Sequence, residues 1–383
     1  MKVLLDVSAV TAPLSGIGRY ALELARHLPA TSGVNAVQFL RGDRVTDSFD
    51  PHPVAVAAPT GGLRRWLKPL LPYNLLLGPY RRHKARVLAR GLRAYTDHIY
   101  YSPNFSVPPV RGKSVVTLHD LSVFHFPEFH PRDRVNYLKE QIAHSVDRAD
   151  HLVTDSDFVR GELIALFDLP GERVTAIPLG VEPAFRPHTP GELTAVMARY
   201  GLQAGSYLLS VGTVEPRKNL MGLLQAYQQL APSLRQRFPL VIAGAYGWNS
   251  TQVMKKISQL RQSGEVIYLD YVPEQELHAL YAGAAAFAYF SFYEGFGLPV
   301  LEAMSSGVPV VCADSSALPQ LCAGSALQVD PHDIQAMRFA LQRVLEDESW
   351  RGMVGEAGLA HSAAYTWQRT AELVVEVMRT LAR

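Results

Sequence analysis

The chain has 383 residues, of which 48% are hydrophobic and 19% charged, with a net charge of +2. This length predicts two folded domains rather than one, and the composition excludes a disordered or fibrous chain. No run of 18 or more uncharged apolar residues occurs, so we expect no membrane-spanning helix. The two cysteines, Cys312 and Cys322, favour neither a disulfide framework nor a metal site, which fits a reducing cytoplasm.

Short apolar strands alternate with helical patterns along the chain, which predicts an α/β fold with parallel sheets. The N-terminal run contains Asp6, so we expect a first strand there rather than a signal peptide. The strands expected in the first half are Val3–Val7, Ala36–Leu40, His98–Tyr101, Ser114–Leu118 and His151–Thr154. Those expected in the second half are Tyr207–Val211, Leu240–Ala243, Val266–Leu269, Ala286–Tyr289, Pro309–Val311 and Ala326–Val329.

The segment Pro178–Pro190 contains four prolines and no helical periodicity, which predicts an interdomain linker. The expected domains are therefore residues 1–177 and 191–363. Residues 364–383 follow them, and Trp367–Leu381 has the pattern of an amphipathic helix.

A glycine-rich segment, Ser15–Ala21, follows the first expected strand and contains a G-x-G-x-x-A pattern at Gly16 and Gly18. A dinucleotide-binding site requires a tight turn between strand and helix, whereas Ala9–Ser15 intervene here. We therefore favour a glycine loop whose helix N-terminus faces a phosphate across a cleft, with a simple helix start as the alternative.

Residues 51–96 contain nine Lys or Arg residues and no Asp or Glu. Basic clusters interleaved with Trp66, Leu and Tyr favour contact with an anionic membrane surface through residues 61–93. The alternatives are a solvated helical face and a nucleic-acid surface, but no nucleic-acid-binding motif accompanies the charge. The basic residues are Arg64, Arg65, Lys68, Arg81, Arg82, Lys84, Arg86, Arg90 and Arg93.

His119 and Asp120 follow an expected strand, where a parallel sheet presents its active groups. We expect Asp120 to orient the imidazole of His119 and to fix its tautomer. The triplet Asp155-Ser156-Asp157 resembles a metal-binding D-x-D, but its place after a strand predicts a helix N-cap instead. No metal site is assigned.

A basic pair, Arg217 and Lys218, follows the first expected strand of the second domain. At the carboxyl end of a strand, Arg217 can grip a diphosphate with two hydrogen bonds and Lys218 can add a point charge. The alternative is a solvated basic turn before a helix.

The stretch Ser291–Val311 places two carboxylates, Glu294 and Glu302, seven residues apart. Glycines at 295 and 297 and a proline at 299 predict a loop that opens into a helix, with Glu302 inside the helix. The backbone N–H groups beside that helix N-terminus favour an oxygen-rich or anionic ligand. The alternative is a loop–helix junction with two solvated acids.

This stretch closely resembles the E-x7-E motif of retaining glycosyltransferases of family 4, which have the GT-B fold. The glycine loop, His-Asp pair, Arg-Lys pair and terminal helix occur in the family's order. The resemblance implies two Rossmann-like domains facing a cleft, with the C-terminal helix packed back on the first domain. In some members the arginine directly follows the glycine after the strand, whereas Thr213 stands there in this chain.

The resemblance also implies roles for individual residues. Glu302 would hold the nucleotide ribose, the loop around Val272 would meet the base, and His119 would contact the donor sugar. The residues expected to be catalytic are His119, Glu294, Arg217 and Lys218. Those expected to bind the donor are Gly16, Gly18, Arg217, Lys218, Val272, Glu294, Gly295, Phe296, Gly297, Leu298 and Glu302. Arg19, Tyr20 and Asp120 are expected on the acceptor side.

By similarity to bacterial O-antigen and exopolysaccharide mannosyltransferases, we expect transfer of a hexosyl group from a nucleoside-diphosphate sugar with retention of configuration. GDP-mannose or a related GDP-deoxyhexose is the expected donor, with UDP- and dTDP-sugars as alternatives, and a polyprenyl-diphosphate-linked glycan is the expected acceptor. The protein is then expected at the cytoplasmic face of the cell membrane, with no metal or other cofactor and no nucleic-acid partner. Two alternatives are a sugar-nucleotide epimerase of the same architecture and a NAD-dependent oxidoreductase.

Overall fold

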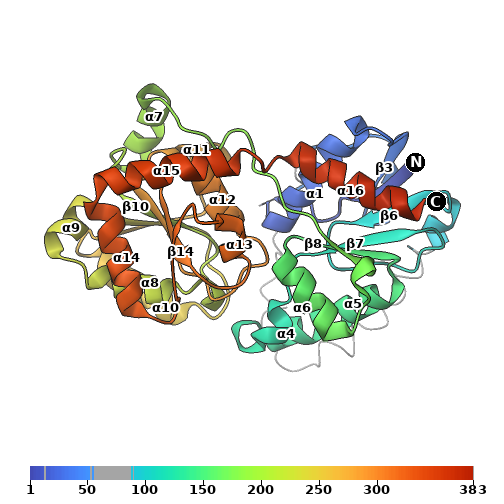
Figure 1. Cartoon of the computed structure of the whole chain (residues 1–383), viewed down its shortest axis with the longest axis horizontal. Coiled ribbons are helices and arrows are strands. Elements are labelled where there is room, and N and C mark those ends of the chain that lie inside the picture. Colours follow the sequence, from blue (N-terminus) through green and yellow to red (C-terminus); the bar gives the residue numbers. More distant parts are fainter. Residues whose placement is uncertain (13, 52–53, 56–87, 89, 383) are drawn as a thin grey trace, which may run out of the picture.

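The computed structural model describes residues 1–12, 14–51, 54–55, 88 and 90–382. These residues form two lobes, each built around a mainly parallel sheet that is covered by helices (Figure 1). The predicted α/β class and the two-lobed architecture are confirmed.

The first lobe contains a seven-stranded sheet of order β4-β3-β1-β6-β7-β8-β9, in which only the pair β3–β4 is antiparallel. All residues of β7 and β8 are buried, as expected for central strands covered on both faces. The strands are β1 Lys2–Asp6, β3 Ala36–Arg41, β4 Arg44–Thr46, β6 His98–Ser102, β7 Ser114–Leu118, β8 His151–Thr154 and β9 Val174–Ala176. Two short strands, β2 Thr11–Ala12 and β5 Val54–Ala55, pair separately.

The second lobe contains a six-stranded parallel sheet of order β12-β11-β10-β13-β14-β15. The strand order reverses beside β10, and in open α/β sheets ligands bind outside the strand ends at such a point. The strands are β10 Leu208–Val211, β11 Leu240–Ala243, β12 Val266–Asp270, β13 Ala286–Tyr289, β14 Val310–Ala313 and β15 Leu327–Val329.

Helices connect these strands in both lobes. The α-helices of the first lobe are α1 Gly16–His27, α4 Ser122–His125, α5 Arg132–Arg148 and α6 Asp157–Phe167. Those of the second are α7 Pro190–Tyr200, α8 Leu220–Gln228, α9 Pro232–Arg237, α10 Thr251–Arg261, α11 Glu274–Ala282, α12 Leu298–Ser305, α13 Leu318–Cys322, α14 Ile334–Glu346 and α15 Glu348–Ser362. The short 3₁₀ helices are η1 Leu28–Ala30, η2 Leu92–Ala94, η3 Pro127–Phe129, η4 Gly171–Arg173 and η5 Pro216–Lys218.

Every strand that the sequence predicted is present, with ends that differ by no more than two residues. The prediction missed β2, β4, β5 and β9. These strands have two or three residues, which is too few for a periodic pattern to show.

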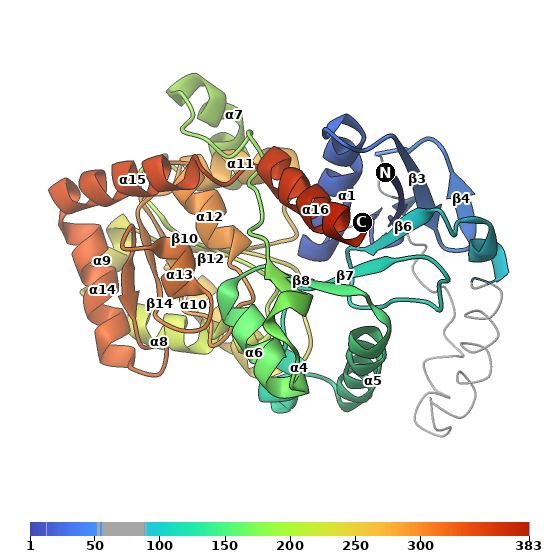
Figure 2. The same cartoon turned by 45° about the vertical axis from the view of Figure 1, so that its right-hand side comes forward.

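The chain crosses between the lobes twice, along one edge. The predicted linker leaves the first lobe after β9 and reaches α7 at Pro190, and the last helix, α16 Trp367–Leu381, returns to the first lobe against α1 (Figures 1 and 2). The crossings touch at Gly180, where a Cβ atom would lie 2.1 Å from the backbone nitrogen of Trp367. The predicted return of the C-terminal helix is confirmed, while the domain boundaries at 177 and 191 stay predictions.

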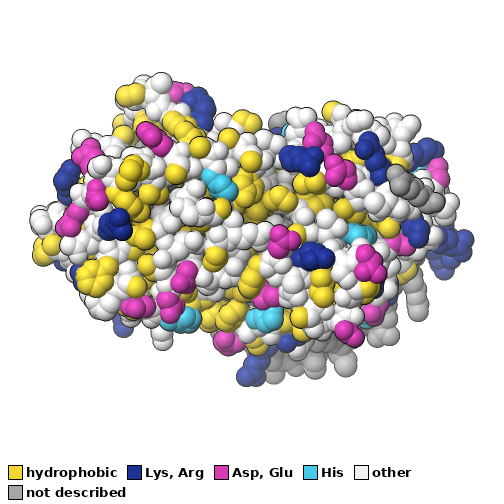
Figure 3. Space-filling view, in the orientation of Figure 1, with side chains coloured by type: hydrophobic (Ala, Val, Ile, Leu, Met, Phe, Trp, Pro, Cys, Tyr) yellow, Lys and Arg dark blue, Asp and Glu magenta, His cyan; other side chains and the backbone are white. Residues whose placement is uncertain are grey.

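Most of the basic stretch lies outside the described residues. Arg64, Arg65, Lys68, Arg81, Arg82, Lys84 and Arg86 are among the residues not described, and Arg90 and Arg93 are described. Among the described residues, no helix is long and apolar enough to cross a membrane. On the face shown in Figure 3, acidic and basic side chains are interspersed over both lobes.

Candidate active site

A buried ion-pair cluster lies where β10 and β13 end in the second lobe. The carboxylate of Glu294 accepts hydrogen bonds from Lys218 Nζ at 2.7 Å and from Arg217 Nη1 at 3.0 Å. Ser291 Oγ and the Tyr289 hydroxyl donate to the same carboxylate, at 2.5 Å and 2.9 Å. We call Glu294, Arg217 and Lys218 the Glu294 cluster. The structure thus brings together three of the residues that the sequence assigned to the donor site.

Burial and charge act against each other in this cluster. Burial would raise the pKa of Glu294, but Arg217 and Lys218 lower it to about 2. Burial and the neighbouring Arg217 lower the pKa of Lys218, although Glu294 offsets part of this effect. Glu215 also pairs with Arg217 Nη2 at 2.8 Å, so two buried carboxylates balance the two cations, and an anionic ligand such as a diphosphate would compete with them for Arg217 and Lys218.

The glycine loop that follows Glu294 touches the first lobe directly. A Cβ atom on Gly295 would lie 1.8 Å from the carbonyl oxygen of His119, and Ser156 Oγ donates a hydrogen bond to the Gly295 carbonyl at 2.7 Å. Gly297 has φ of 112° and caps α12, which begins at Leu298 as predicted. The side chain of Phe296 beside it is buried. The lobes are therefore closed against each other at this loop.

Glu302, one turn into α12, belongs to a second group of charges. Burial raises its pKa to about 7, and the guanidinium of Arg19 offsets part of that effect. Arg19 pairs with Glu182 at 2.8 Å and also with Glu274. It thus joins α1 of the first lobe to the linker and to the start of α11. We call Arg19, Glu182, Glu274 and Glu302 the Arg19 cluster.

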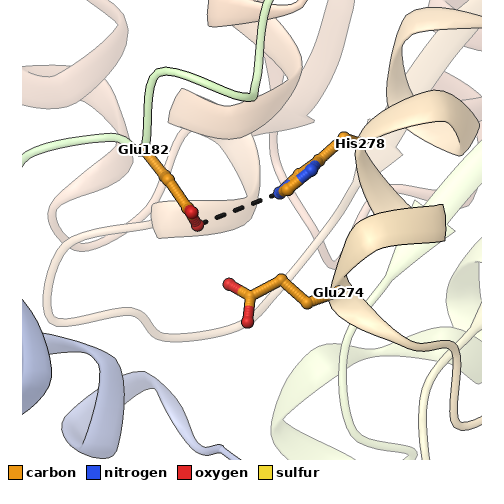
Figure 4. Close-up of side chains that lie close together, drawn as sticks. All are labelled: Glu182, Glu274 and His278. Carbon is orange, nitrogen blue, oxygen red and sulfur yellow. Dashed lines mark ion pairs between the residues drawn. The ribbon is translucent and has the colours of Figure 1, made fainter. Parts of the chain in front are cut away.

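One group of side chains among the described residues could hold a metal ion, and it overlaps this cluster. The ligand atoms of Glu182, Glu274 and His278 lie within 4.8 Å of one another (Figure 4). His278 Nε2 points toward Glu182 at 3.9 Å. Because Arg19 already pairs with both carboxylates, a guanidinium supplies the positive charge at this position.

His119 lies at the carboxyl end of β7 with both ring nitrogens engaged. Nδ1 lies 2.7 Å from Asp155 Oδ2, and Nε2 lies 2.8 Å from the Pro103 carbonyl oxygen. The Pro103 carbonyl can only accept, so Nε2 carries a proton, while burial raises the pKa of the Asp155 carboxyl that faces Nδ1. Burial would lower the pKa of His119, but Asp155 raises it. The prediction that Asp120 orients His119 is wrong, because Asp155 does so and Asp120 Oδ1 accepts from the backbone and hydroxyl of Ser122.

Ser156 begins α6 as its N-cap, since its side chain accepts a hydrogen bond from Val159 N at 3.3 Å. The predicted cap is confirmed for this residue. The sequence analysis placed Asp155 only in the turn before α6. In the structure, Asp155 is the partner of His119. Nothing in the sequence signalled that pairing, because the two residues follow neighbouring strands, β7 and β8, that are far apart along the chain.

The glycine-rich segment of the first lobe begins a helix without a tight turn, as expected, and its contact with a phosphate stays a prediction. Gly16 and Gly18 lie in the first turn of α1, which Ser15 caps by accepting from Gly18 N at 3.1 Å. At Gly18 a Cβ atom would lie 2.8 Å from the Ala9 carbonyl, so close packing requires this glycine. Gly16 has open space around it. Residues 7–15 separate β1 from α1 and include β2, so the tight turn of a dinucleotide-binding site does not form.

Two further predicted residues are buried. Tyr20 is 1% exposed, and its hydroxyl lies 2.7 Å from the Tyr101 hydroxyl and 3.1 Å from Thr117 Oγ1. The assignment of Tyr20 to the acceptor side is therefore wrong, since it has no surface for a ligand. Val272 is 7% exposed in the loop before α11, where only its backbone can meet a ligand.

A small cavity between the lobes contains residues that the sequence analysis missed. Its volume is about 80 Å³, and its walls include His119 and Asp120 of the first lobe and Arg217 of the second. The other polar and aromatic side chains in its walls are Phe105, Ser122, His130, Arg134, Glu215 and Trp248, and the rest of the lining is apolar. We call it the His130 cavity. His130 and Trp248 lie in irregular segments where no motif singled them out.

Family models match both lobes. Residues 14–185 match "Glycosyltransferase Family 4", and residues 201–361 match "Glycosyl transferases group 1". The chain is 38% identical to the O-antigen chain mannosyltransferase B of Escherichia coli over 381 residues, which covers all of both chains. It is 30% identical over 286 residues to a serotype-specific mannosyltransferase of the same species, across 72% of this chain and 34% of that one.

Solved structures share the fold at lower identity. A sucrose-phosphate synthase from Thermosynechococcus elongatus superposes with a TM-score of 0.74 at 19% identity, over 100% of this chain and 99% of that one. WaaG, a glycosyltransferase involved in lipopolysaccharide biosynthesis, has a TM-score of 0.73 at 15% identity, over 98% and 99%. Anabaena HepE in complex with UDP-glucose has a TM-score of 0.72 at 16% identity, over 99% and 100%.

Proposed function

The chain belongs to glycosyltransferase family 4, and we propose that it transfers a mannosyl or related hexosyl group from a GDP-sugar to a hydroxyl of a growing surface glycan, with retention of configuration and without a metal. The relative at 38% identity is an O-antigen mannosyltransferase, which supports the glycan class of acceptor. A lipid-diphosphate carrier on that glycan is part of the proposal.

The observation that carries the proposal is the Glu294 cluster. Lys218 and Arg217 lie at the point where the strand order of the sheet reverses, and both are buried. In such a dry site, their charge offsets the negative charge that grows on a departing diphosphate, which is the kind of effect that contributes most to many enzymes. The positive charges of Lys218 and Arg217 stabilise the diphosphate, as a divalent metal ion does in other enzymes.

The remaining parts of the site support donor binding in the same cleft. Glu302 lies one turn into α12, where it can accept hydrogen bonds from the two ribose hydroxyls. The backbone of Gly295–Leu298 precedes and opens that helix, so its N–H groups can meet sugar hydroxyls. Neither ring nitrogen of His119 is free to bind a sugar hydroxyl, because both already have protein partners.

A transfer assay with defined donors tests the proposal. GDP-mannose, UDP-glucose and a dTDP-deoxyhexose would each be supplied with octyl α-mannoside, in the presence and absence of EDTA. We expect transfer from the GDP-sugar that EDTA does not reduce, and an α-linked product in the NMR spectrum. A β-linked product would refute retention, and loss of activity with EDTA would refute metal independence.

A further inference from the structure

We propose that Tyr293 is a positioning residue for the proposed reaction. The first lobe holds its side chain and its carbonyl holds Arg217, so closure of the lobes sets the orientation of that guanidinium. The inference rests on the proposed function, because it names a residue that aligns one cation of the same donor site.

The side chain of Tyr293 crosses the boundary between the lobes. Tyr293 belongs to the second lobe, in the segment between β13 and α12, but its ring packs against three aromatic rings of the first lobe. The ring centroid lies 6.1 Å from that of His125, 5.6 Å from that of Phe126 and 5.9 Å from that of Phe158. Only 2% of Tyr293 is exposed. The residue is therefore anchored in the lobe that it faces.

The hydroxyl of Tyr293 bonds to two groups of the first lobe. The backbone N–H of Leu121 donates to it at 3.2 Å, and the hydroxyl donates to the carboxylate of Glu162. Burial, Asp120 and Glu162 raise the pKa of Tyr293, so the hydroxyl keeps the proton that it donates. Leu121 lies two residues after His119 and precedes α4. The tyrosine thus contacts the segment that carries His119.

The backbone around Tyr293 holds Arg217 from the other side. The Tyr293 carbonyl accepts a hydrogen bond from Arg217 Nη1 at 2.7 Å, which is shorter than the 3.0 Å from the same nitrogen to Glu294. The N–H of Phe292 donates to the carbonyl of Arg217 at 2.9 Å. Arg217 lies at the lobe boundary, since it lines the His130 cavity together with residues of the first lobe. One short segment therefore fixes both the backbone and the side chain of Arg217.

A single residue thus links an anchor in the first lobe to a cation of the donor site. When the lobes move apart, the hydroxyl of Tyr293 loses both of its partners, and the segment that carries its carbonyl is no longer held from that side. A displacement of about 1 Å can cost an enzyme about 100-fold in rate, and lobe closure completes many catalytic sites. Lys218 differs from Arg217, because its partners Tyr289 and Glu294 both belong to the second lobe. The orientation of Arg217 therefore depends on closure more directly than that of Lys218.

Deletion of the hydroxyl in two backgrounds tests the inference. Tyr293→Phe keeps the ring and removes both bonds of the hydroxyl. Tyr207→Phe is the matched control, because it removes a buried hydroxyl that donates to the Leu280 carbonyl within the second lobe at 2.6 Å. Each would be made in the wild type and in Arg217→Lys, since lysine cannot reproduce the geometry of the guanidinium. Transfer would be assayed with octyl α-mannoside and the donor that the wild type uses, and thermal unfolding would show that each full chain is folded.

We expect Tyr293→Phe to lower kcat/KM about tenfold in the wild type, because two hydrogen bonds between the lobes are lost. In Arg217→Lys the loss should be less than about threefold, because the group that Tyr293 positions is already gone. Tyr207→Phe should stay within about threefold of its parent in both backgrounds. A tenfold loss in both backgrounds would show that Tyr293 acts apart from Arg217. That result, no loss in the wild type, or an equal loss in Tyr207→Phe would overturn the inference.

Small-angle X-ray scattering separates this inference from the proposed function, since it needs no substrate. We expect Tyr293→Phe to have a larger radius of gyration than the wild type, because the open form gains population, and Tyr207→Phe to match the wild type. An unchanged radius in Tyr293→Phe would overturn the inference whichever donor is used. If no donor is turned over but the radius grows, the proposed function fails and the role of Tyr293 in closure stands.

Discussion

Nζ of Lys218 lies 2.7 Å from Oε1 of Glu294, and the two side chains are 12% and 8% exposed. Removing either member of such a buried pair leaves an uncompensated charge, and Arg217 pairs with the same carboxylate at 3.0 Å, so the three side chains form one charge system. In the proposed function, Arg217 and Lys218 bind the diphosphate of the donor. Replacement of one of these cations is therefore the first test of the site.

Replacement of Lys218 by alanine should abolish the stabilisation by a nucleoside diphosphate. A ligand at 100 times its dissociation constant stabilises the folded wild type by about 2.7 kcal/mol, and we expect most of this to disappear when Nζ is removed. Thermal shifts with GDP, UDP, dTDP and ADP measure the effect. Lys2→Ala is the control, because Lys2 forms an exposed ion pair with Asp97 in the first lobe and does not belong to the Glu294 cluster. An unchanged shift in Lys218→Ala would remove Lys218 from the donor site.

Glu294→Gln should destabilise the fold at neutral pH by about 3–5 kcal/mol, because buried Lys218 loses the carboxylate with which it pairs and Arg217 keeps only Glu215. The folded pKa of about 2 lies below the usual value of 4.5, so the stabilisation is present above about pH 4.5 and is lost as the pH falls through about 2. Urea unfolding of wild type and variant from neutral to acid pH should show the difference shrinking. Glu192→Gln is the matched control, since Arg186 also lowers the pKa of Glu192 to about 2 but at a fully exposed site. Equal effects of the two substitutions would contradict this account.

For Glu302 we expect the opposite dependence of folding stability on pH. Its folded pKa of about 7 lies above 4.5, so the folded state holds a proton that the unfolded state releases. Stability should therefore fall by up to about 3 kcal/mol as the pH rises from about 5 to about 8. Glu302→Gln keeps the side chain neutral and should flatten this slope in urea unfolding. The slope should not vanish, because the pKa of Glu182 is also raised to about 7 by burial and by Glu274. An unchanged slope in the variant would show that Glu302 is ionised throughout.

Gly295→Ala should prevent the lobes from closing without unfolding either of them. The new Cβ would overlap the carbonyl oxygen of His119. No side-chain rotation can relieve this clash, because the backbone fixes the position of both atoms. We expect kcat/KM to fall at least about 100-fold, as for displacements of about 1 Å in other enzymes, with little change in the melting temperature. Gly161→Ala, where an added Cβ meets nothing, is the control. Normal activity of Gly295→Ala would mean that closure at this contact is unnecessary.

Much of this site was accessible from the sequence because motifs are local. The E-x7-E stretch and the Arg-Lys pair each follow a buried strand, and parallel strands end at the same edge, so Glu294 meets Lys218. The hydrophobic pattern predicted every strand with four or more residues, whereas β2 and β9 were too short for such a pattern.

The errors concern contacts between segments that no local pattern links. Asp120 directly follows His119, yet Asp155, which follows the neighbouring strand β8, holds the imidazole. Tyr20 lies in a motif beside a site residue, but the helix turns it into the core. His130 and Trp248 meet only when the lobes close, at a ring-centroid distance of 5.9 Å. Such neighbours depend on the tertiary fold, and a single sequence carries no trace of them.

The return of α16 has a consequence for how the protein is made. Trp367 packs near Tyr20, and Val374 and Met378 are fully buried in the core cluster that contains the strands of the first lobe. All of β1 to β9 leave the ribosome before these residues are synthesised, and domains usually fold as units, N-terminal first, during synthesis. Here the first lobe is left with an uncovered apolar face on α1 until the last helix emerges. The lobe that is translated first is thus the one that is completed last.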